Sequence, residues 1–503
     1  MRPLSPEFRA YAWAPSTEEL ARRAGLDASQ IVRFDGNVPP LPLPSSRPAT
    51  VARALAHVNE YPHGGYPELI AAIAAYAGVE PENVVLGNGA DDLILLVTRA
   101  FAGDGDTVAI ANDPTYPLYR VAAGLVGATI GDDDPVLTFC CRPNNPTGSL
   151  DPLPAARPLA VDEAYLEFSE DDGVAASIEE GVIAIRTFSK AFARAGARVG
   201  SALASADVAA ELNTRQAPLA VATPSAALAL AALAAPPDPR PTIEERERLA
   251  EELRKLGFEP LPSRTNFLYV PVDDPGEVAA RLLARGCVPR VYEDAIRITV
   301  RDREDDDLLL AALAGTDAPA GRSARHLRAT AETALRVRLR LDGASRVRVA
   351  TGAGLYDHFL EQLAFNAGLD LELQGAGDAE TGPHHTAEDS AIALGEALDR
   401  ALGTRSGIAR YGDAVVPMDD ALARAAVDLG GRRASVIRLE HDPGLAKHVL
   451  QSLADAGRLC IHVESTGEDP HHVAEAAFKA TGRALRAALR QDGSLVPSTK
   501  GIL

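Results

Sequence analysis

Cysteine is scarce in this chain of 503 residues, which contains only Cys140, Cys141, Cys287 and Cys460. No two of them form a CxxC pair, and the adjacent Cys140 and Cys141 are poorly placed for a structural disulfide. Such sparse cysteine is typical of proteins in a reducing compartment. The sequence therefore predicts a cytoplasmic protein.

The chain also lacks a hydrophobic run long enough for a signal peptide or a membrane span. Its first six residues, MRPLSP, contain no apolar run. The longest apolar stretch, residues 217–235, is rich in alanine and is interrupted by Pro218 and Pro224. This stretch predicts a buried helix, and we expect no membrane association.

The chain has fewer basic than acidic residues: 50 lysines and arginines against 70 aspartates and glutamates, which gives a formal charge of −20. A general nucleic-acid binder needs basic surface to neutralise phosphates, so we expect no nucleic-acid partner. The hydrophobic content of 46% and the charged content of 24% are those of a globular protein, which excludes a wholly disordered chain. The length predicts two or three folding units.

Two different patterns follow one another along the chain. From about residue 50 to 315, short apolar runs such as 159–161 and 182–185 alternate with helical runs such as 91–101 and 304–313. This alternation predicts an α/β fold with a mainly parallel sheet, whose ligands bind at the carboxyl ends of the strands. Beyond a Gly- and Pro-containing linker, residues 335–341 alternate apolar and basic side chains, and 346–349 continue the alternation. That alternation predicts a half-buried strand with a solvated basic face.

The second part contains an internal repeat. HHTAE at residues 384–388 recurs as HHVAE at 471–475, and an alanine-rich helical run follows each copy. The repeat predicts a duplicated α+β domain. In each copy a histidine and a glutamate lie one helical turn apart, and imidazole with carboxylate suits a divalent ion such as Mn²⁺.

Motifs in the first part resemble the fold-type I aminotransferases that use pyridoxal phosphate (PLP), in particular the histidinol-phosphate aminotransferase family. They are GNGAD at 87–91, DPTY at 113–116, PNNPTG at 143–148, VDEAY at 161–165 and TFSKAF at 187–192. The resemblance covers about residues 30–315. It implies a PLP-dependent transferase fold over 1–314, with small-domain segments at about 1–45 and 240–314, and a linker at 315–324.

The resemblance also implies roles for individual side chains. Lys190 would bind PLP covalently, and Asp162 would hold the proton on the ring nitrogen. Tyr61 would contact the cofactor of a neighbouring subunit, which implies a dimer. The further cofactor contacts are Gly89, Ala90, Asp91, Tyr116, Asn145, Tyr165, Ser189 and Arg198. The substrate contacts are Asn37, Asn266, Arg290 and Arg297, and two arginines suit a phosphorylated substrate, with glutamate as the amino donor.

The second part, residues 325–503, resembles the imidazoleglycerol-phosphate dehydratase family. Its motifs include LYDH at 355–358, GIARYG at 407–412, AFKA at 477–480 and PSTKG at 497–501, besides the two HHxxE copies. The resemblance implies a ribosomal protein S5 domain 2-like fold, two Mn²⁺ ions per site and a 24-subunit shell. The implied metal ligands are His358, His384, His385, Glu388, His448, His471, His472 and Glu475.

The same resemblance implies that Glu388 or Glu475 moves protons, and that five further residues contact the substrate. These are Glu332, Arg410, Arg432, Ser498 and Lys500. One departure concerns Asn366, where the family commonly has histidine, because asparagine cannot shuttle a proton near neutral pH.

Together the two resemblances imply a bifunctional enzyme of histidine biosynthesis. The dehydratase would make imidazole acetol phosphate, and the aminotransferase would convert it to histidinol phosphate. Two alternatives stay open at this point: a PLP decarboxylase or an aminotransferase of other specificity in the first part, and a catalytically weak assembly scaffold in the second.

Overall fold

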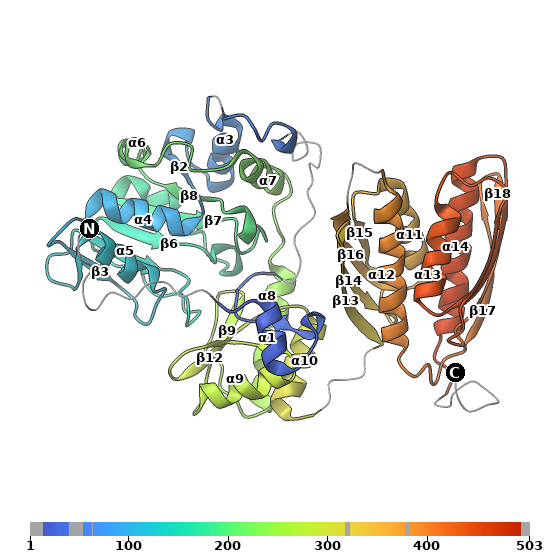
Figure 1. Cartoon of the computed structure of the whole chain (residues 1–503). Helices are drawn as coiled ribbons and strands as arrows, with labels where there is room; N and C mark the ends of the chain where they lie inside the picture. Colours follow the sequence, from blue (N-terminus) through green and yellow to red (C-terminus); the bar gives the residue numbers. More distant parts are fainter. Residues whose placement is uncertain (1–13, 40–53, 63, 317–321, 378–381, 494–503) are drawn as a thin grey trace. The chain divides into compact units, whose positions relative to one another are not determined.

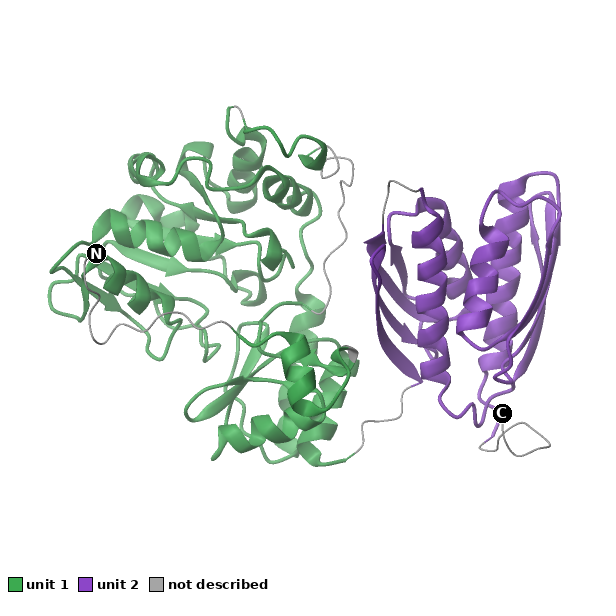
Figure 2. Ribbon diagram, in the orientation of Figure 1, with its two compact units in different colours: residues 1–318 green, residues 319–503 purple. Residues whose placement is uncertain are grey.

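The computed structural model describes residues 14–39, 54–62, 64–316, 322–377 and 382–493. The chain divides into two compact units, Met1–Ala318 and Pro319–Leu503 (Figure 2). Each unit has its own apolar core. In the described part of the chain, no helix combines the length and apolarity needed to cross a bilayer.

The larger part of the first unit is built on a seven-stranded sheet (Figure 1). Its order is β2 (Val84–Gly87), β8 (Gly200–Leu203), β7 (Val182–Thr187), β6 (Leu159–Asp162), β5 (Leu137–Cys141), β3 (Thr107–Ile110) and β4 (Thr129–Ile130). All neighbours from β7 to β4 pair in parallel, whereas β8 is antiparallel to both β7 and β2. The central strands β5 and β6 are buried throughout, as expected of a sheet covered on both faces.

The helices that accompany this sheet in the described residues are α3 (Pro67–Ala77), α4 (Ala90–Phe101), α5 (Leu118–Val126), α6 (Ala206–Arg215) and α7 (Thr223–Leu233). Helix α4 buries Leu93, Ile94 and Val97, whose spacing places them on one helix face. The helix expected over 217–235 begins only at Thr223, because Pro224 is tolerated in the first helical turn but not further along.

A second apolar core in this unit joins segments from both ends of its sequence. The small sheets are β1 (Val32–Arg33) with β10 (Cys287–Val288), and β11 (Arg290–Val291), β12 (Ala295–Thr299) and β9 (Phe267–Pro271). The helices are α1 (Thr17–Ala24), α8 (Arg240–Lys255), α9 (Pro275–Ala284) and α10 (Arg303–Ala314). Asp302 caps α10 by accepting a 3.1 Å hydrogen bond from the Asp305 amide, and Gly315 ends it with φ of 68°. Single-turn 3₁₀ helices and one longer one lie at Ala28–Gln30, Pro81–Asn83, Leu166–Phe168, Ala175–Glu180 and Ala195–Ala197.

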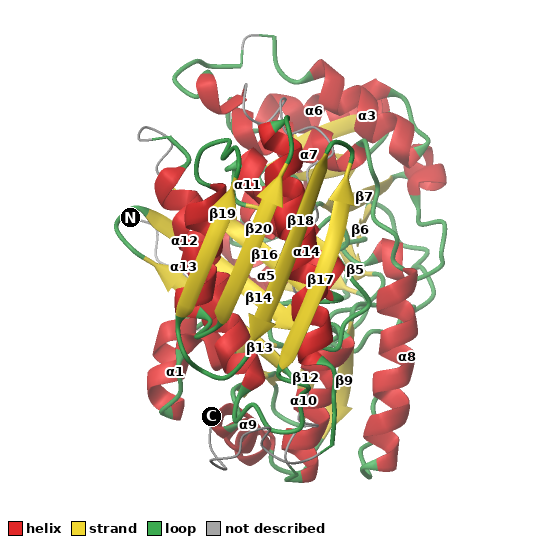
Figure 3. Cartoon of the chain, turned by 90° about the vertical axis from the view of Figure 1, so that its right-hand side faces the viewer, coloured by secondary structure: helices red, strands yellow, loops and turns green. Residues whose placement is uncertain are grey.

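The second unit consists of two halves with the same topology. The first half contains β13 (Ser323–Ala329), β14 (Thr333–Arg340), β15 (Val347–Ala350), α11 (Gly354–Ala367), β16 (Asp370–Gly377) and α12 (His384–Leu402). The second half contains β17 (Tyr411–Met418), β18 (Ala421–Asp428), β19 (Ala434–Leu439), α13 (Ala446–Ala456), β20 (Cys460–Thr466) and α14 (Pro470–Leu489). The sheet orders β13-β14-β16-β15 and β17-β18-β20-β19 correspond strand for strand, so the repeat seen in the sequence is a duplicated fold. Figure 3 shows the second of these sheets.

The four helices of this unit lie between its two sheets and share one core with them (Figure 1). Strand β14 alternates buried and exposed residues, as the apolar–basic alternation predicted. The continuation of that alternation at residues 346–349 lies in a separate strand. It belongs to β15, which pairs in parallel with β16 at the opposite edge from β13.

Candidate active sites

The first candidate site lies at the carboxyl ends of three neighbouring parallel strands. Asp162 is the last residue of β6, Lys190 follows β7, and Asn145 follows β5. Since parallel strands end at the same sheet edge, these three side chains lie where such folds bind ligands.

Asp162 is buried, with only 4% of its surface exposed. Its Oδ2 accepts a 2.7 Å hydrogen bond from the Tyr119 hydroxyl, and its Oδ1 accepts one of 3.1 Å from the Ala164 amide. Burial raises the pKa of Asp162 to about 6. A carboxylate in this position can hold a proton on a ring nitrogen facing it.

Tyr119 was not singled out from the sequence. It stacks on Phe139 with ring centroids 4.8 Å apart and an interplanar angle of 10°. The signal available was its spacing from Tyr116, three residues earlier and close to the same helix start. That spacing brings the Tyr116 ring edge to Tyr119, with centroids 5.9 Å apart.

Lys190 lies beside Tyr165, its Nζ 5.6 Å from the ring centroid, and it donates a 3.4 Å hydrogen bond to the Gly36 carbonyl. Burial, and then the positive charge of Arg297, lower the pKa of Lys190 to about 8. At pH 7 roughly a tenth of this amine is therefore unprotonated, far more than for an ordinary lysine, which favours a nucleophilic role.

Arg198 and Gly89 lie next to each other at the start of α4. Gly89 caps this helix with φ of 85°, and a Cβ there would lie 2.6 Å from an Arg198 guanidinium nitrogen. Arg198 forms a 3.0 Å ion pair with Asp91, and the Nη1 of Arg198 lies 3.5 Å from the Ser189 hydroxyl. Asp91 also accepts a 3.0 Å hydrogen bond from Tyr116. The helix N-terminus with this guanidinium can bind a phosphate, and the positive φ at position 89 favours glycine there.

Two arginines face one another across the β11–β12 pair, where Arg290 and Arg297 are register partners. Arg297 is 6% exposed and is held by hydrogen bonds to Asn145, to the Tyr292 hydroxyl (3.1 Å) and to the Asp35 carbonyl (2.9 Å). Its Nε is buried with no hydrogen-bond partner among the described residues. Arg290 is exposed.

Asn37 and Asn266 connect these arginines to the Lys190 region. Asn37 donates a 3.0 Å hydrogen bond to the Tyr165 hydroxyl, and Asn266 donates one of 3.2 Å to the Asn37 carbonyl. The Oδ1 of Asn266 is buried and has no partner within the described segments. A buried polar atom without a protein partner can accept its hydrogen bond from a bound ligand. The residues present therefore fit a bound PLP and its substrate.

Tyr61 lies apart from this arrangement. Its surface is 76% exposed, and among the described residues no hydrogen bond or ring contact joins it to the other candidate cofactor residues. Its role as a phosphate contact for a neighbouring subunit stays a prediction.

The second unit contains two clusters of metal-binding side chains. One joins His384 and Glu388 of α12 to His448 of α13, with Glu388 oxygens 3.5 and 3.4 Å from the two imidazoles. In each cluster one ligand atom per residue lies within 4.8 Å of the others.

The other cluster joins His471 and Glu475 of α14 to His358 of α11. A Glu475 oxygen lies 3.2 Å from His471 Nε2 and 3.6 Å from His358 Nε2. Each cluster thus takes its His-Glu pair from one half of the duplication and its remaining histidine from the other. The buried Nε2 of His448 has no hydrogen-bond partner in the described chain, and two imidazoles with one carboxylate fit a divalent metal.

His385 and His472 lie outside these clusters. His385 Nδ1 is 3.6 Å from Glu332, whereas His472 Nδ1 lies 2.5 Å from Asp420 and its Nε2 3.5 Å from Asp419. The hydrogen bond to Asp420 raises the pKa of His472. The two acidic partners of His472 were not predicted from the sequence.

Of the other expected substrate contacts, Arg410 pairs with Asp428 at 2.7 Å and Arg432 is exposed. Ser498 and Lys500 lie outside the described residues. Lys479, missed as a site residue, lies 2.8 Å from Glu475, and this pairing lowers the pKa of that carboxylate. Its place one helical turn after Glu475 was the available signal.

These geometries define an enzyme that joins a PLP-type lysine site to a duplicated metal-binding unit. Residues 29–132 and 131–313 match the family model "Aminotransferase class I and II", and 351–485 match "Imidazoleglycerol-phosphate dehydratase". The chain belongs to the aminotransferase class I and II family through its first unit and to the imidazoleglycerol-phosphate dehydratase family through its second.

Individual relatives agree with both assignments. The imidazoleglycerol-phosphate dehydratase of Salinispora tropica is 44% identical over 201 residues, which cover 36% of this chain and 99% of that protein. That of Methanothermobacter thermautotrophicus is 46% identical over 184 residues, covering 35% and 95%. The crystal structure of histidinol-phosphate aminotransferase from Sinorhizobium meliloti with pyridoxal-5'-phosphate is 26% identical, with a TM-score of 0.53, and covers 60% of this chain and 95% of that one.

Proposed function

We propose that this chain is a bifunctional enzyme of histidine biosynthesis that catalyses two consecutive steps. The second unit dehydrates imidazoleglycerol phosphate to imidazole acetol phosphate. The first unit transfers an amino group from glutamate to that ketone and yields L-histidinol phosphate. The observation that carries this proposal is the presence, in one chain, of the Lys190–Asp162 site and the paired histidine–glutamate clusters.

In the first unit, bound PLP would supply an electron sink for the substrate's α-carbon. Lys190, with its lowered pKa, would bind the cofactor and move a proton at that carbon. Asp162 would keep the proton on the cofactor's ring nitrogen. The opposed Arg290 and Arg297 would bind anionic groups of the substrate, since a guanidinium matches phosphate and carboxylate oxygens.

In the second unit, we propose that the two clusters hold two Mn²⁺ ions, which would act as Lewis acids toward the imidazole ring of the substrate. Glu388 and Glu475, one in each cluster, would transfer protons. Lys479 orients Glu475 through its 2.8 Å contact. Arg410 and Arg432, with Ser498 and Lys500, would bind the phosphate.

The protein would act as a homo-oligomer, and we propose a cytoplasmic location because cysteine is scarce. Exposed Tyr61 supports an aminotransferase dimer in which it reaches the neighbouring phosphate site. His385 and His472 are outside the clusters of their own chain, which supports metal sites completed by other copies in a dehydratase shell. Both sites would then depend on assembly.

A coupled assay tests both activities together. Purified protein with Mn²⁺, PLP and glutamate receives imidazoleglycerol phosphate as the only carbon substrate, and histidinol phosphate is measured. Product formation supports both steps. Product from imidazole acetol phosphate alone would place the defect in the second unit and favour the scaffold alternative. No product from either substrate, in protein whose absorbance shows bound PLP, contradicts the aminotransferase assignment.

A further inference from the structure

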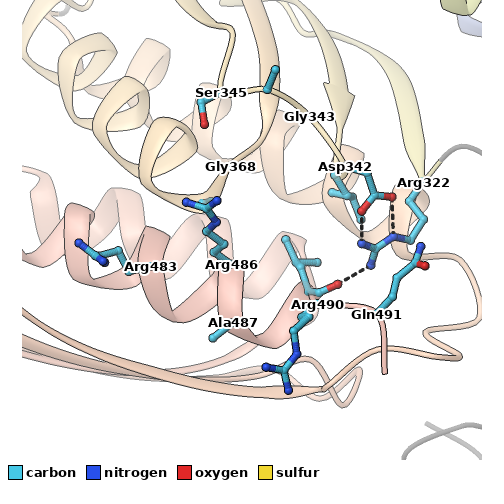
Figure 4. A pocket seen from close by; sticks show the side chains of 14 residues that line it. Arg322, Asp342, Gly343, Ser345, Gly368, Arg483, Arg486, Ala487, Arg490 and Gln491 are labelled. Carbon is cyan, nitrogen blue, oxygen red and sulfur yellow. Dashed lines mark hydrogen bonds and ion pairs between the residues drawn. The ribbon is translucent and has the colours of Figure 1, made fainter. Parts of the chain in front are cut away.

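A hollow of about 870 Å³ opens at the C-terminal end of α14, against the end of α11 and the loop before β15 (Figure 4). Its charged side is formed by Arg483, Arg486 and Arg490. Arg483 and Arg486 are three residues apart on one face of α14, and Arg490 is the residue that follows the helix. All three are exposed.

These arginines have no carboxylate partner among the described residues. Two acidic residues of this region, Asp342 in the lining of the hollow and Asp370, are engaged with other groups. Asp342 pairs with Arg322, whose Nε lies 3.0 Å from it, while Asp370 accepts hydrogen bonds from the Arg346 side chain (2.8 Å) and from two backbone amides. These contacts lower the pKa of Asp370. Figure 4 shows the three arginine side chains turned to different sides. Because like charges in one region repel one another, an anion bound at the hollow would be stabilised.

The other side of the hollow is formed by backbone whose position is held by hydrogen bonds and close packing. Arg322 donates a 2.7 Å hydrogen bond to the Leu489 carbonyl and so ties the start of β13 to the end of α14. A Cβ on Gly343 would lie 2.2 Å from the Asp370 amide nitrogen, which leaves room for no larger residue in this loop. A Cβ on Gly368 would lie 3.3 Å from Arg486 Nε, so that side chain crosses the end of α11 (Figure 4).

We propose that this hollow is a binding site for a phosphorylated small molecule, separate from the metal clusters. Guanidinium groups match phosphate oxygens in bidentate geometry. The volume is within the range of sites for small organic ligands, and it exceeds what a single phosphate group would fill. Fifteen residues of α14 separate Arg486 from His471, about 22 Å along the helix axis, so a ligand here does not contact the clusters.

The test uses the full-length protein carrying PLP and Mn²⁺, titrated calorimetrically with fructose 1,6-bisphosphate. The variant R483Q/R490Q removes two guanidinium groups and retains Arg486, which packs on Gly368. The matched control R240Q/R438Q removes two exposed arginines, each of which pairs with a carboxylate elsewhere. Heat from the two substrate sites is common to all three proteins, so their difference reports this hollow.

We expect the wild type and the control to bind one more equivalent per chain than R483Q/R490Q does, or to bind it at least tenfold more tightly. Dehydratase turnover should be the same in all three proteins. Identical titrations would overturn the proposal. A changed sedimentation coefficient of R483Q/R490Q alone would also overturn it, because these arginines would then contact a second copy of the chain.

Discussion

The hydroxyl of Tyr119 donates a 2.7 Å hydrogen bond to Oδ2 of Asp162, the carboxylate at the end of β6. This bond favours the ionised carboxylate and opposes the effect of burial, which raises the pKa of Asp162 to about 6. Tyr119 is itself held rigidly by its stacking on Phe139. Its position therefore determines how much carboxylate is available near neutral pH.

Tyr119→Phe should raise the pKa of Asp162 further and weaken PLP binding at pH 7. The stability loss should be about 1.5–3 kcal/mol, the usual value of a hydrogen bond to a charged group. The dissociation constant of PLP, measured across pH, should reach its low plateau at a higher pH than in the wild type. Tyr76→Phe is the control, since the structure shows no hydrogen bond from that hydroxyl to any described residue. An unchanged pH profile in Tyr119→Phe would contradict the role of this bond.

Arg297→Gln should raise the pKa of Lys190, because the guanidinium charge disfavours the lysine ammonium form. In protein stripped of PLP, acetylation of Lys190 followed by peptide mass spectrometry should be half-maximal near pH 8 in the wild type. The same midpoint should move upward in the variant. Lys255 provides an internal reference, since its ion pairs with Glu251 and Glu252 raise its pKa. Equal Lys190 midpoints in the two proteins would refute the coupling.

Glu388→Gln and Glu475→Gln should each weaken metal binding at the cluster to which the glutamate belongs, because each removes the single carboxylate ligand there. The loss should exceed the roughly 10–100-fold that follows when only a residue supporting a ligand is removed. Metal content after dialysis should fall from two equivalents per chain towards one in either variant, and towards none in the double variant. Glu464→Gln is the control, since Glu464 is exposed and pairs only with Arg438 among the described residues. Retention of both metals in the single variants would show that the clusters are not the binding sites.

Asn366→His should change dehydratase kcat by less than about tenfold. Asn366 donates a 2.9 Å hydrogen bond to the Gln362 carbonyl, and it lies eight residues after His358 on α11, about 12 Å along the axis. Its own chain's cluster is therefore out of its reach. Asn366→Ala should likewise keep measurable turnover. An inactive wild type restored by Asn366→His would instead support the scaffold alternative.

Much of the fold was predictable from local pattern. Buried strands β5 and β6, the one-sided helix α4 and the alternating strand β14 follow from hydrophobic spacing, which reflects burial directly. Alternation marks a strand but does not determine which neighbour it pairs with, so the pairing of residues 347–350 with β16 could not be predicted. Tyr119 was missed for a related reason: a buried tyrosine looks the same in sequence whether or not it contacts a carboxylate.

The sequence by itself determined the two-part organisation, the chemistry available to each part and the pairing of histidine with glutamate one turn apart on α12 and α14. Helical spacing is local, so those pairs needed no tertiary information. Only the tertiary structure decided that His448 joins the α12 pair and His358 the α14 pair. That crossing of the two halves depends on how α11, α12, α13 and α14 pack between the sheets, and packing of residues far apart in the chain is set by the shared core.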